Sequence, residues 1–296
     1  MGSFNADLVS YMARMPQSGE TVMGDRFVTG PGGKGSNQAV AAARLGAQIT
    51  FIARVGQDTL AEIGLNLWRS EGIDTSYISR DPDAATGVAT IFVDRDGHNM
   101  IVVTLGANGE LRPAHVDDAE VAIANADVLL TQLESPLETV AHALQVAKRN
   151  GVRTILNPAP AQPLDASLLQ YVDILTPNEH ELALVTGEAD SVRATSKVHA
   201  AGVNTLIVTL GKQGASWKDK FGAGSVVPAY SVEAVDTVGA GDAFNGALAV
   251  GLAEGKPIDA AVRFANAAAA VSVTRAGAAA SMGRRDEVEA LIAAQP

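Results

Sequence analysis

The 296-residue sequence contains no cysteine, only 4% aromatic residues and no long apolar run. The lack of cysteine excludes disulfides, thiolate catalysis and cysteine-ligated zinc or iron–sulfur centres, and it fits a reducing compartment. No run approaches the roughly 20 apolar residues that a transmembrane helix needs, and the N-terminus has no basic segment followed by an apolar one. We therefore expect a soluble, cytoplasmic protein in which any metal ion is held by oxygen ligands.

Positive charge is also scarce, because 22 Lys and Arg stand against 33 Asp and Glu, a formal net charge of -11. This balance argues against a nucleic-acid backbone or an anionic membrane as partner. The scarcity of aromatics also argues against base stacking. A small anionic substrate remains possible, since a local group of amides or one lysine can outweigh the global charge. The length suits a single large α/β domain over residues 1–296.

Strands and helices alternate regularly through most of the chain. We expect strands at Val128–Leu133, Thr154–Asn157, Asp173–Leu175 and Thr205–Thr209, and helices between them near Leu137–Arg149, Ala166–Tyr171 and Glu179–Val185. This order predicts an α/β fold with a mostly parallel central sheet flanked by helices on both faces. An earlier strand and helix are expected at Ile49–Val55 and Thr59–Ser70. Three more helices are expected near the C-terminus, at 243–254, 258–273 and 286–294.

Two predicted hairpins stand outside this alternation, one pairing residues 8–12 with 21–29 and the other pairing 87–93 with 100–105. They could form one small β-sheet without helices of its own, so one of its faces must cover a ligand cleft or another subunit. We expect this sheet to be a lid formed by about 8–30 and 86–105. Residues 1–7 are typical of a strand end and the loop after it, so we expect a first strand that is only partly present.

The segment Val235–Phe244 carries the most specific chemistry. Gly239 and Gly241 allow the backbone to turn with its amides exposed, and an anion can bind such amides at a helix start. Asp242 at the same place repels phosphate, so its expected task is to accept a proton from an attacking hydroxyl. The alternative is an ordinary glycine turn with Asp242 as helix cap.

Polar residues follow successive predicted strands, where ligands of parallel sheets bind. Each of them alone could be a turn or cap residue, but together they indicate a shared cleft. Asn178 and Glu181 illustrate the choice, because they form a capping-box pattern and could equally lie beside hydrated Mg²⁺ and phosphates. The set comprises Asn5 and Asp7, Glu134, Asn157, Asn178 with Glu181, Thr209 with Gly211, and Asp242.

The glycine-rich loop at 30–35 admits two interpretations. Gly30, Gly32 and Gly35 match the pattern G-x-G-x-x-G, and Asp58 follows further on, which is compatible with a dinucleotide-dependent oxidoreductase. Against this interpretation, a short hairpin arm leads into the loop instead of a buried apolar strand. A Walker loop is excluded, because Gly35 replaces the required Ser or Thr. Otherwise the loop presents amides, Lys34 and Asn37 to a polyhydroxyl ligand or phosphate, and Asp7 could accept hydrogen bonds from vicinal hydroxyls.

Over nearly its whole length the sequence resembles the ribokinase-like (pfkB) carbohydrate kinase superfamily. The motifs that carry the resemblance are Gly2–Asp7, Gly32–Gln38, Gln132–Pro136, Asn157–Pro160, Asn178-x-x-Glu181 and Asp236–Asp242. The resemblance implies ATP-dependent phosphorylation of D-ribose to D-ribose 5-phosphate. Kinases of another small sugar or a nucleoside, such as 2-deoxyribose, a ketohexose or an adenosine-like compound, are the nearest alternatives. A non-catalytic sugar-binding protein is a further one, against which the presence of Asp242 argues.

The resemblance also implies a role for individual residues. Asp242 would be the catalytic base, and the amides of Gly239, Ala240 and Gly241 the anion hole. The sugar would be held by Asn5, Asp7, Gly33, Lys34, Asn37, Glu134 and Asp242. The nucleotide site would comprise Asn178, Thr209, Gly211, Gly214, Gly241 and Asn266. A potassium ion is implied at Asp236, Val238, Ser272, Arg275, Gly277 and Ser281, and Mg²⁺ at Glu181 through water. A homodimer through the lid sheet is also implied.

Overall fold

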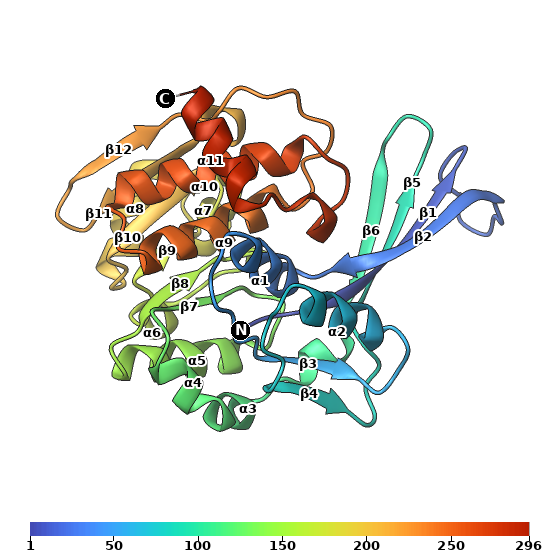
Figure 1. Cartoon of the computed structure of the whole chain (residues 1–296), viewed down its shortest axis with the longest axis horizontal. Helices are drawn as coiled ribbons and strands as arrows, with labels where there is room; N and C mark the ends of the chain where they lie inside the picture. Colours follow the sequence, from blue (N-terminus) through green and yellow to red (C-terminus); the bar gives the residue numbers. More distant parts are fainter. Residues whose placement is uncertain (296) are drawn as a thin grey trace.

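The computed structural model describes residues 1–295 and is organised around a six-stranded sheet (Figure 1). Its strand order is β12-β11-β10-β9-β8-β7. Four strands are parallel, and the hairpin β11–β12 adds two antiparallel strands at one edge. The bounds are β7 Val128–Thr131, β8 Arg153–Leu156, β9 Ile174–Leu175, β10 Thr205–Thr209, β11 Ala215–Asp219 and β12 Gly224–Val227.

Helices cover both faces of this sheet, as the alternation of strands and helices predicts. Successive residues of a strand point to opposite faces, so Leu156 and Leu175 pack into one core cluster while Ile155 and Ile174 pack into another. The first cluster includes α3 Pro113–Asp118, α4 Glu120–Ala124, α5 Leu137–Arg149, α6 Ala166–Leu169, α7 Glu179–Thr186 and α8 Ser191–Ala200. The second includes α1 Lys34–Arg44, α9 Ala240–Ala253, α10 Ile258–Val273 and α11 Arg285–Ala294.

A separate four-stranded sheet projects from this body, at the right of Figure 1. Its order is β2-β1-β5-β6, so the two predicted hairpins do pair, through the parallel strands β1 and β5. Its bounds are β1 Asn5–Met12, β2 Gly24–Gly32, β5 Val88–Val93 and β6 Asn99–Thr104. All of β6 is exposed, including the apolar residues Met100–Val103.

A third core cluster fastens the start of β1 to the body. The rings of Phe4 and Phe51 pack edge-on against Trp68 at centroid distances of 5.2 and 5.1 Å. Trp68 belongs to α2 Ala61–Ser70, and the strands β3 Ala53–Gly56 and β4 Ile78–Asp81 lie beside it. The remaining elements are short 3-10 turns at η1 Gly106–Glu110, η2 Gly211–Gln213 and η3 Ala279–Ser281.

The expected strand Ile49–Val55 is only partly correct. The structure has a strand over Ala53–Gly56, whereas the stretch before it makes one isolated bridge, from Thr50 to Asp74. There the Phe51 amide donates to the Asp74 carbonyl and the Asp74 amide donates to the Ile49 carbonyl, which makes a single bridge and not a run of paired residues. The sequence analysis did not identify β4, α3, α4 or α8. No helix within residues 1–295 is long and apolar enough to cross a membrane.

Candidate active site

Helix α9 begins near the carboxyl end of β9, because Asn245 Oδ1 accepts a hydrogen bond of 2.6 Å from the hydroxyl of Thr176, the residue after that strand. The helix carries Asp242 in its first turn. Gly239 caps the helix with φ 80°, a left-handed conformation that favours glycine. The first amides of a helix lack intrahelical acceptors, and of these the Ala240 amide makes only a long bond of 3.3 Å to the Thr237 carbonyl. A Cβ on Gly241 would meet no atom within 4 Å, so the space beside these amides is open.

The Asp242 carboxylate is buried and held by two side-chain amides. Asn37 Nδ2 donates to Oδ2 at 2.9 Å, and Gln38 Nε2 donates to Oδ1 at 3.0 Å. Burial raises the pKa of Asp242 above its usual range, although the Lys34 charge and the two amide donors oppose the rise. A fixed carboxylate with a raised pKa is suited to accept a proton from a hydroxyl.

The close packing of α1 against α9 explains why these groups meet. A Cβ on Gly246 would lie 2.7 Å from the Ala41 Cβ and 2.8 Å from the Gln38 carbonyl oxygen, so only glycine allows this approach. Gly246 lies one helical turn after Asp242 and therefore on the same face of α9. The helix contact thereby sets the position of the carboxylate relative to Gln38.

Gln38 is a site residue that the sequence analysis quoted in a motif without giving it a role. Its Nε2 donates to Asp242 and also lies 3.1 Å from Asn157 Oδ1. Its Oε1 accepts a hydrogen bond of 2.5 Å from Gln132 Nε2. The sequence does indicate a site role for Gln38, because Gln38 follows Asn37 in the first turns of α1. Its partner Gln132 likewise lies two residues before Glu134.

The residues expected to hold the sugar lie on β1, on the start of α1 and after β7. Gly33 has φ 86°, and a Cβ there would come within 2.6 Å of the Asn5 amide nitrogen, so glycine is required. Glu134 is buried and accepts a hydrogen bond of 3.0 Å from the Lys34 amide. Asn5 Oδ1 accepts from Asn108 Nδ2 at 3.0 Å, and Asn108 is another residue that the sequence analysis missed.

Two oxygen acceptors in this group have no partner among residues 1–295. Asn37 Oδ1 is buried without a hydrogen bond. The Asp7 carboxylate likewise accepts none from the described residues, and burial, followed by the charge of Glu134, raises the pKa of Asp7 to about 6. Buried polar groups are normally paired, so these acceptors are available to the hydroxyl groups of a ligand.

The residues expected at the nucleotide site form a connected series along the same edge. The Thr209 amide donates to the Pro177 carbonyl at 3.0 Å, beside Asn178. The Gly214 amide donates to the Gly211 carbonyl at 3.0 Å. Asn266 is buried and donates to the Val227 carbonyl at 3.0 Å, and Val227 pairs with the residue after Gly214.

Asn178 and Glu181 form the capping box that their spacing predicts. The Asn178 amide donates to Glu181 Oε2 at 2.8 Å, and the Glu181 amide donates to Asn178 Oδ1 at 2.8 Å. Glu181 Oε1 makes no hydrogen bond to the described residues, so one carboxylate oxygen is left for a water molecule on a metal ion. His180 has no partner within residues 1–295.

The loops expected to bind potassium are brought together. Asp236 joins them, because Oδ1 accepts from the Val238 amide at 3.0 Å and Oδ2 from the Gly277 amide at 2.9 Å. The Arg275 amide donates to the Ser272 carbonyl at 3.2 Å. Ser281 is fully buried in the loop after Gly277, where its hydroxyl donates to the Ala278 carbonyl at 2.8 Å.

The dinucleotide interpretation of the glycine-rich loop is not supported. β2, which leads into the loop, is an edge strand exposed over most of its length and not a buried parallel strand. The Asp58 carboxylate is occupied by the Thr86 amide at 2.7 Å and by the Ala61 amide at 3.0 Å, so its role is structural. Neither feature fits the binding of a dinucleotide by a Rossmann unit.

The buried Asp242 carboxylate, the unpaired oxygen of Asn37 and the open amide turn of α9 form an arrangement suited to phosphoryl transfer onto a hydroxyl group. The chain belongs to the pfkB family of carbohydrate kinases, whose family model matches residues 1–284. The ribokinase of Haemophilus influenzae is 44% identical over 97% of this chain and 95% of its own length. A deoxyribokinase of Salmonella typhi is 40% identical over 94% of this chain and 92% of its own. The structure of Arabidopsis thaliana ribokinase complexed with ribose and ATP is 32% identical, with a TM-score of 0.91 over 98% of this chain and 96% of that one.

Proposed function

We propose that this chain transfers the γ-phosphoryl group of ATP to the 5-hydroxyl of D-ribose. The observation that carries the proposal is the Asp242 carboxylate, buried and held by Asn37 and Gln38 beside the open amide turn of α9. The free acceptors Asp7 and Asn37 Oδ1 suit a ligand with several hydroxyl groups. Ribose has such hydroxyls and is small enough to be held by few residues.

In the proposed reaction the sugar binds first between β1 and the start of α1. Asp242 accepts the proton of the sugar 5-hydroxyl. The hydroxyl oxygen attacks the γ-phosphorus of ATP, and ADP leaves. The amides of Gly239, Ala240 and Gly241 stabilise the charge on the transferring group. The Lys34 ammonium reduces repulsion among the carboxylates and the phosphates. Positioning and charge stabilisation carry most of the rate enhancement in phosphoryl transfer.

ATP would occupy the series of residues from Asn178 to Asn266. Mg²⁺ prefers oxygen ligands and usually keeps several waters, so one free oxygen of Glu181 fits contact through water. Within residues 1–295 the one group of three metal-ligating side chains is Asp94, Asp96 and His98, on an exposed hairpin turn. The phosphates themselves would therefore supply most of the magnesium ligands.

Potassium would bind between the two loops joined by Asp236. The proposed ligands are the side-chain oxygens of Asp236 and Ser281 and the carbonyls of Val238, Ser272, Arg275 and Gly277. Val238 and Gly277 lie next to the anion hole. Val238 directly precedes Gly239, and Gly277 directly precedes Ala278, whose Cα would lie 3.2 Å from a Cβ on Gly239. A bound cation would fix the backbone that presents the amides and would add positive charge close to the phosphoryl group.

We further propose one domain over residues 1–296 whose four-stranded sheet closes over the sugar as a lid and forms a homodimer contact. Exposed apolar residues on that sheet support the dimer, because Phe27, Met100 and Val102 are 58–61% exposed. Closure would exclude water that otherwise hydrolyses ATP. A cytoplasmic location follows from the need for ATP.

A coupled assay of ADP release tests the reaction across ribose, 2-deoxyribose, hexoses and nucleosides. Ribose should give the highest kcat/KM. The deoxyribokinase relative favours 2-deoxyribose as the second candidate, and a higher kcat/KM for that sugar would replace ribose. If none of these acceptors leads to ADP release, the kinase proposal is overturned.

The role of Asp242 is tested by Asp242→Asn, which keeps the side-chain shape and removes the proton acceptor. We expect kcat to fall by at least about 10²-fold while ribose affinity, measured by calorimetry, stays nearly unchanged. Asp286→Asn, on the exposed start of α11, is the matched control and should retain full turnover. Near-normal turnover of Asp242→Asn would remove Asp242 from the reaction.

A further inference from the structure

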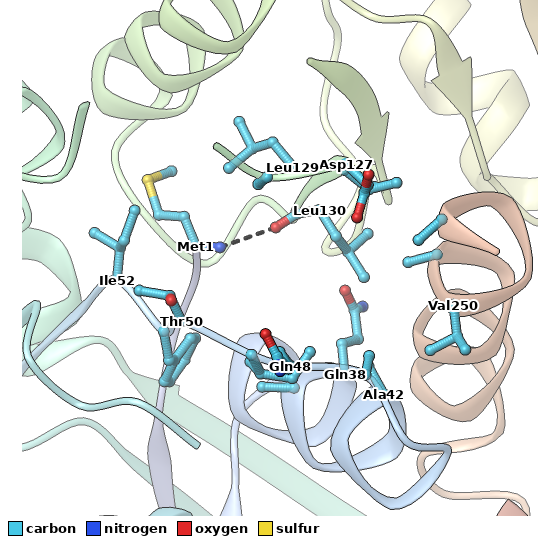
Figure 2. A pocket seen from close by; sticks show the side chains of 18 of the residues that line it. Met1, Gln38, Ala42, Gln48, Thr50, Ile52, Asp127, Leu129, Leu130 and Val250 are labelled. Atoms are coloured by element: carbon cyan, nitrogen blue, oxygen red, sulfur yellow. Dashed lines mark hydrogen bonds between the residues drawn. The ribbon is translucent and has the colours of Figure 1, made fainter. Parts of the chain in front are cut away.

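The backbone that leads into the proposed sugar site is held by neighbours on both sides. The Met1 nitrogen donates to the Leu130 carbonyl of β7 at 2.9 Å, the dashed line in Figure 2. The Gly2 amide donates to the Ile52 carbonyl at 3.1 Å. These bonds fix the path of the main chain up to β1. They do not fix the orientation of the side chain of Asn5, the first residue of that strand.

Asn108 is the residue that determines this orientation. It is buried in the turn η1, which follows β6 of the projecting sheet. Its Oδ1 accepts from the Phe4 amide at 2.9 Å, and its Nδ2 donates to the Phe4 carbonyl at 2.7 Å. A backbone N–H can only donate and a backbone carbonyl can only accept. The main chain of Phe4 therefore fixes which end of the Asn108 carboxamide is oxygen and which is nitrogen.

The nitrogen of Asn108 in turn sets the carboxamide of Asn5. A carboxamide nitrogen carries two hydrogens, and Asn108 Nδ2 uses its second one to donate to Asn5 Oδ1 at 3.0 Å. Only an oxygen can accept that hydrogen, so Asn5 Oδ1 must point toward Asn108. Asn5 Nδ2 donates to no atom of residues 1–295, although Asn5 is only 2% exposed. Buried polar groups are normally paired, so this nitrogen is a donor left for a ligand.

Close packing keeps the two side chains in this arrangement. Gly87 directly precedes β5, and its carbonyl accepts from the Ala6 amide at 2.8 Å. A Cβ on Gly87 would lie 2.2 Å from Asn108 Nδ2 and 2.4 Å from Asn5 Oδ1, so only glycine leaves room for their hydrogen bond. The Asn108 amide donates to the carbonyl of Leu105, the residue after β6, at 3.0 Å. The two ends of the hairpin β5–β6 therefore enclose the bond between Asn5 and Asn108.

We propose that Asn108 is a positioning residue for sugar binding, because it holds the Asn5 carboxamide with its oxygen inward and its nitrogen toward the ligand. Asn5 then donates to an oxygen of the sugar. Asp7, two residues later on the same face of β1, accepts from a sugar hydroxyl. With the opposite orientation of Asn5, the site would present two acceptors side by side. The inference rests on the proposed function, since it requires a sugar bound at Asn5 and Asp7.

The first test is Asn108→Asp, which keeps the size of the side chain and replaces Nδ2 by an acceptor. The new oxygen repels Asn5 Oδ1 and attracts Asn5 Nδ2, so the Asn5 carboxamide should turn its oxygen toward the sugar. We expect KM for ribose, and Kd measured by calorimetry, to rise about 10-fold. We expect kcat at saturating ribose to change little, because Asp242 is held by Asn37 and Gln38.

A double-mutant cycle with Asn5→Ala separates positioning from a general loss of structure. Once the Asn5 side chain is removed, Asn108→Asp should raise Kd little further, because its effect acts through Asn5. If the effects of the two substitutions on Kd multiply, Asn108 acts through the backbone and the inference is wrong. Asn66→Asp, on the exposed side of α2, makes the same chemical change elsewhere and should leave Kd and KM unchanged.

Nuclear magnetic resonance of the parent chain gives a second test that does not depend on the folding of Asn108→Asp. Ribose without ATP should shift the side-chain amide protons of Asn5 downfield, and resonances that do not respond to ribose would overturn the inference. Calorimetry separates the two proposals. If the parent chain binds no ribose, the proposed function fails and this inference fails with it. If the parent chain binds ribose and Asn108→Asp binds it equally well, only the inference fails.

Discussion

Asp7 is the residue at which stability and sugar binding should be most clearly opposed. Its carboxylate is largely buried, accepts no hydrogen bond within residues 1–295 and lies close enough to Glu134 to be repelled. Its pKa rises from the ordinary 3.8 to about 6. A shift of about two pKa units corresponds to about 3 kcal/mol of unfavourable free energy in the ionised folded protein. We predict that Asp7→Asn stabilises the fold by about that amount at pH 8.

The pH dependence of this gain follows from linkage. Between pH 3.8 and about 6 the folded state holds a proton on Asp7 that the unfolded state releases, so the parent chain loses stability as the pH rises. The difference between Asp7→Asn and the parent chain should therefore be near zero below pH 3.8 and complete above about pH 6. Denaturant unfolding at several pH values measures it, and Asp25→Asn on the exposed part of β2 is the control.

Function should change in the opposite direction. Hydrogen bonds to a charged acceptor contribute about 1.5–3 kcal/mol, so Asp7→Asn should raise KM for the sugar by roughly 10- to 100-fold. The KM of the parent chain should rise below pH 6 as Asp7 is protonated, and that rise should be absent from Asp7→Asn. Unchanged stability at pH 8, or a gain of equal size at pH 4 and pH 8, would refute the reasoning.

Three further predictions concern the rest of the site. Gln38→Leu removes one donor to Asp242 and should move the acid limb of the kcat profile to higher pH, with KM for the sugar little changed; a uniform loss at all pH values would indicate a merely structural role. Replacing potassium by sodium should lower turnover of the parent chain but not of Asp236→Asn, and equal rates of the parent chain in both salts would exclude the potassium site. Ile101→Lys on exposed β6 should shift the mass measured by light scattering from dimer to monomer, whereas an unchanged dimer would place the contact elsewhere.

The sequence predicted the sheet and its helices because buried parallel strands and their crossovers have clear periodicities. Isoleucines and leucines at neighbouring positions of β8 and β9 face opposite layers, and a continuous apolar run is how such strands are recognised. The expected strand at Ile49–Val55 began too early, because residues before Ala53 pair only at the bridge from Thr50 to Asp74, and no local pattern reveals how far such pairing extends. α8 was missed, since its Ser-rich exposed sequence has a weak apolar face.

Site residues were predictable where a motif contains unusual residues and less so where a contact is made across the fold. Asp242 and the glycines around it are evident from their spacing. The bond from Gln38 to Asp242 joins residues 204 positions apart and depends on the glycine contact between α1 and α9. The Asn178 and Glu181 capping box was foreseen, but the sequence alone could not tell that it uses one oxygen of Glu181 and leaves the other free.

The position of Asn37 limits how this enzyme can be altered. One end of its amide holds the Asp242 carboxylate, and the other end is a buried oxygen that no residue in 1–295 engages. If the sugar binds that oxygen, a substitution made to admit a new sugar would also displace the base, so selectivity and rate cannot be changed separately there. Engineering of substrate range should begin instead on β1, at Asn5 and Asp7, which belong to the projecting sheet and make no hydrogen bond to Asp242.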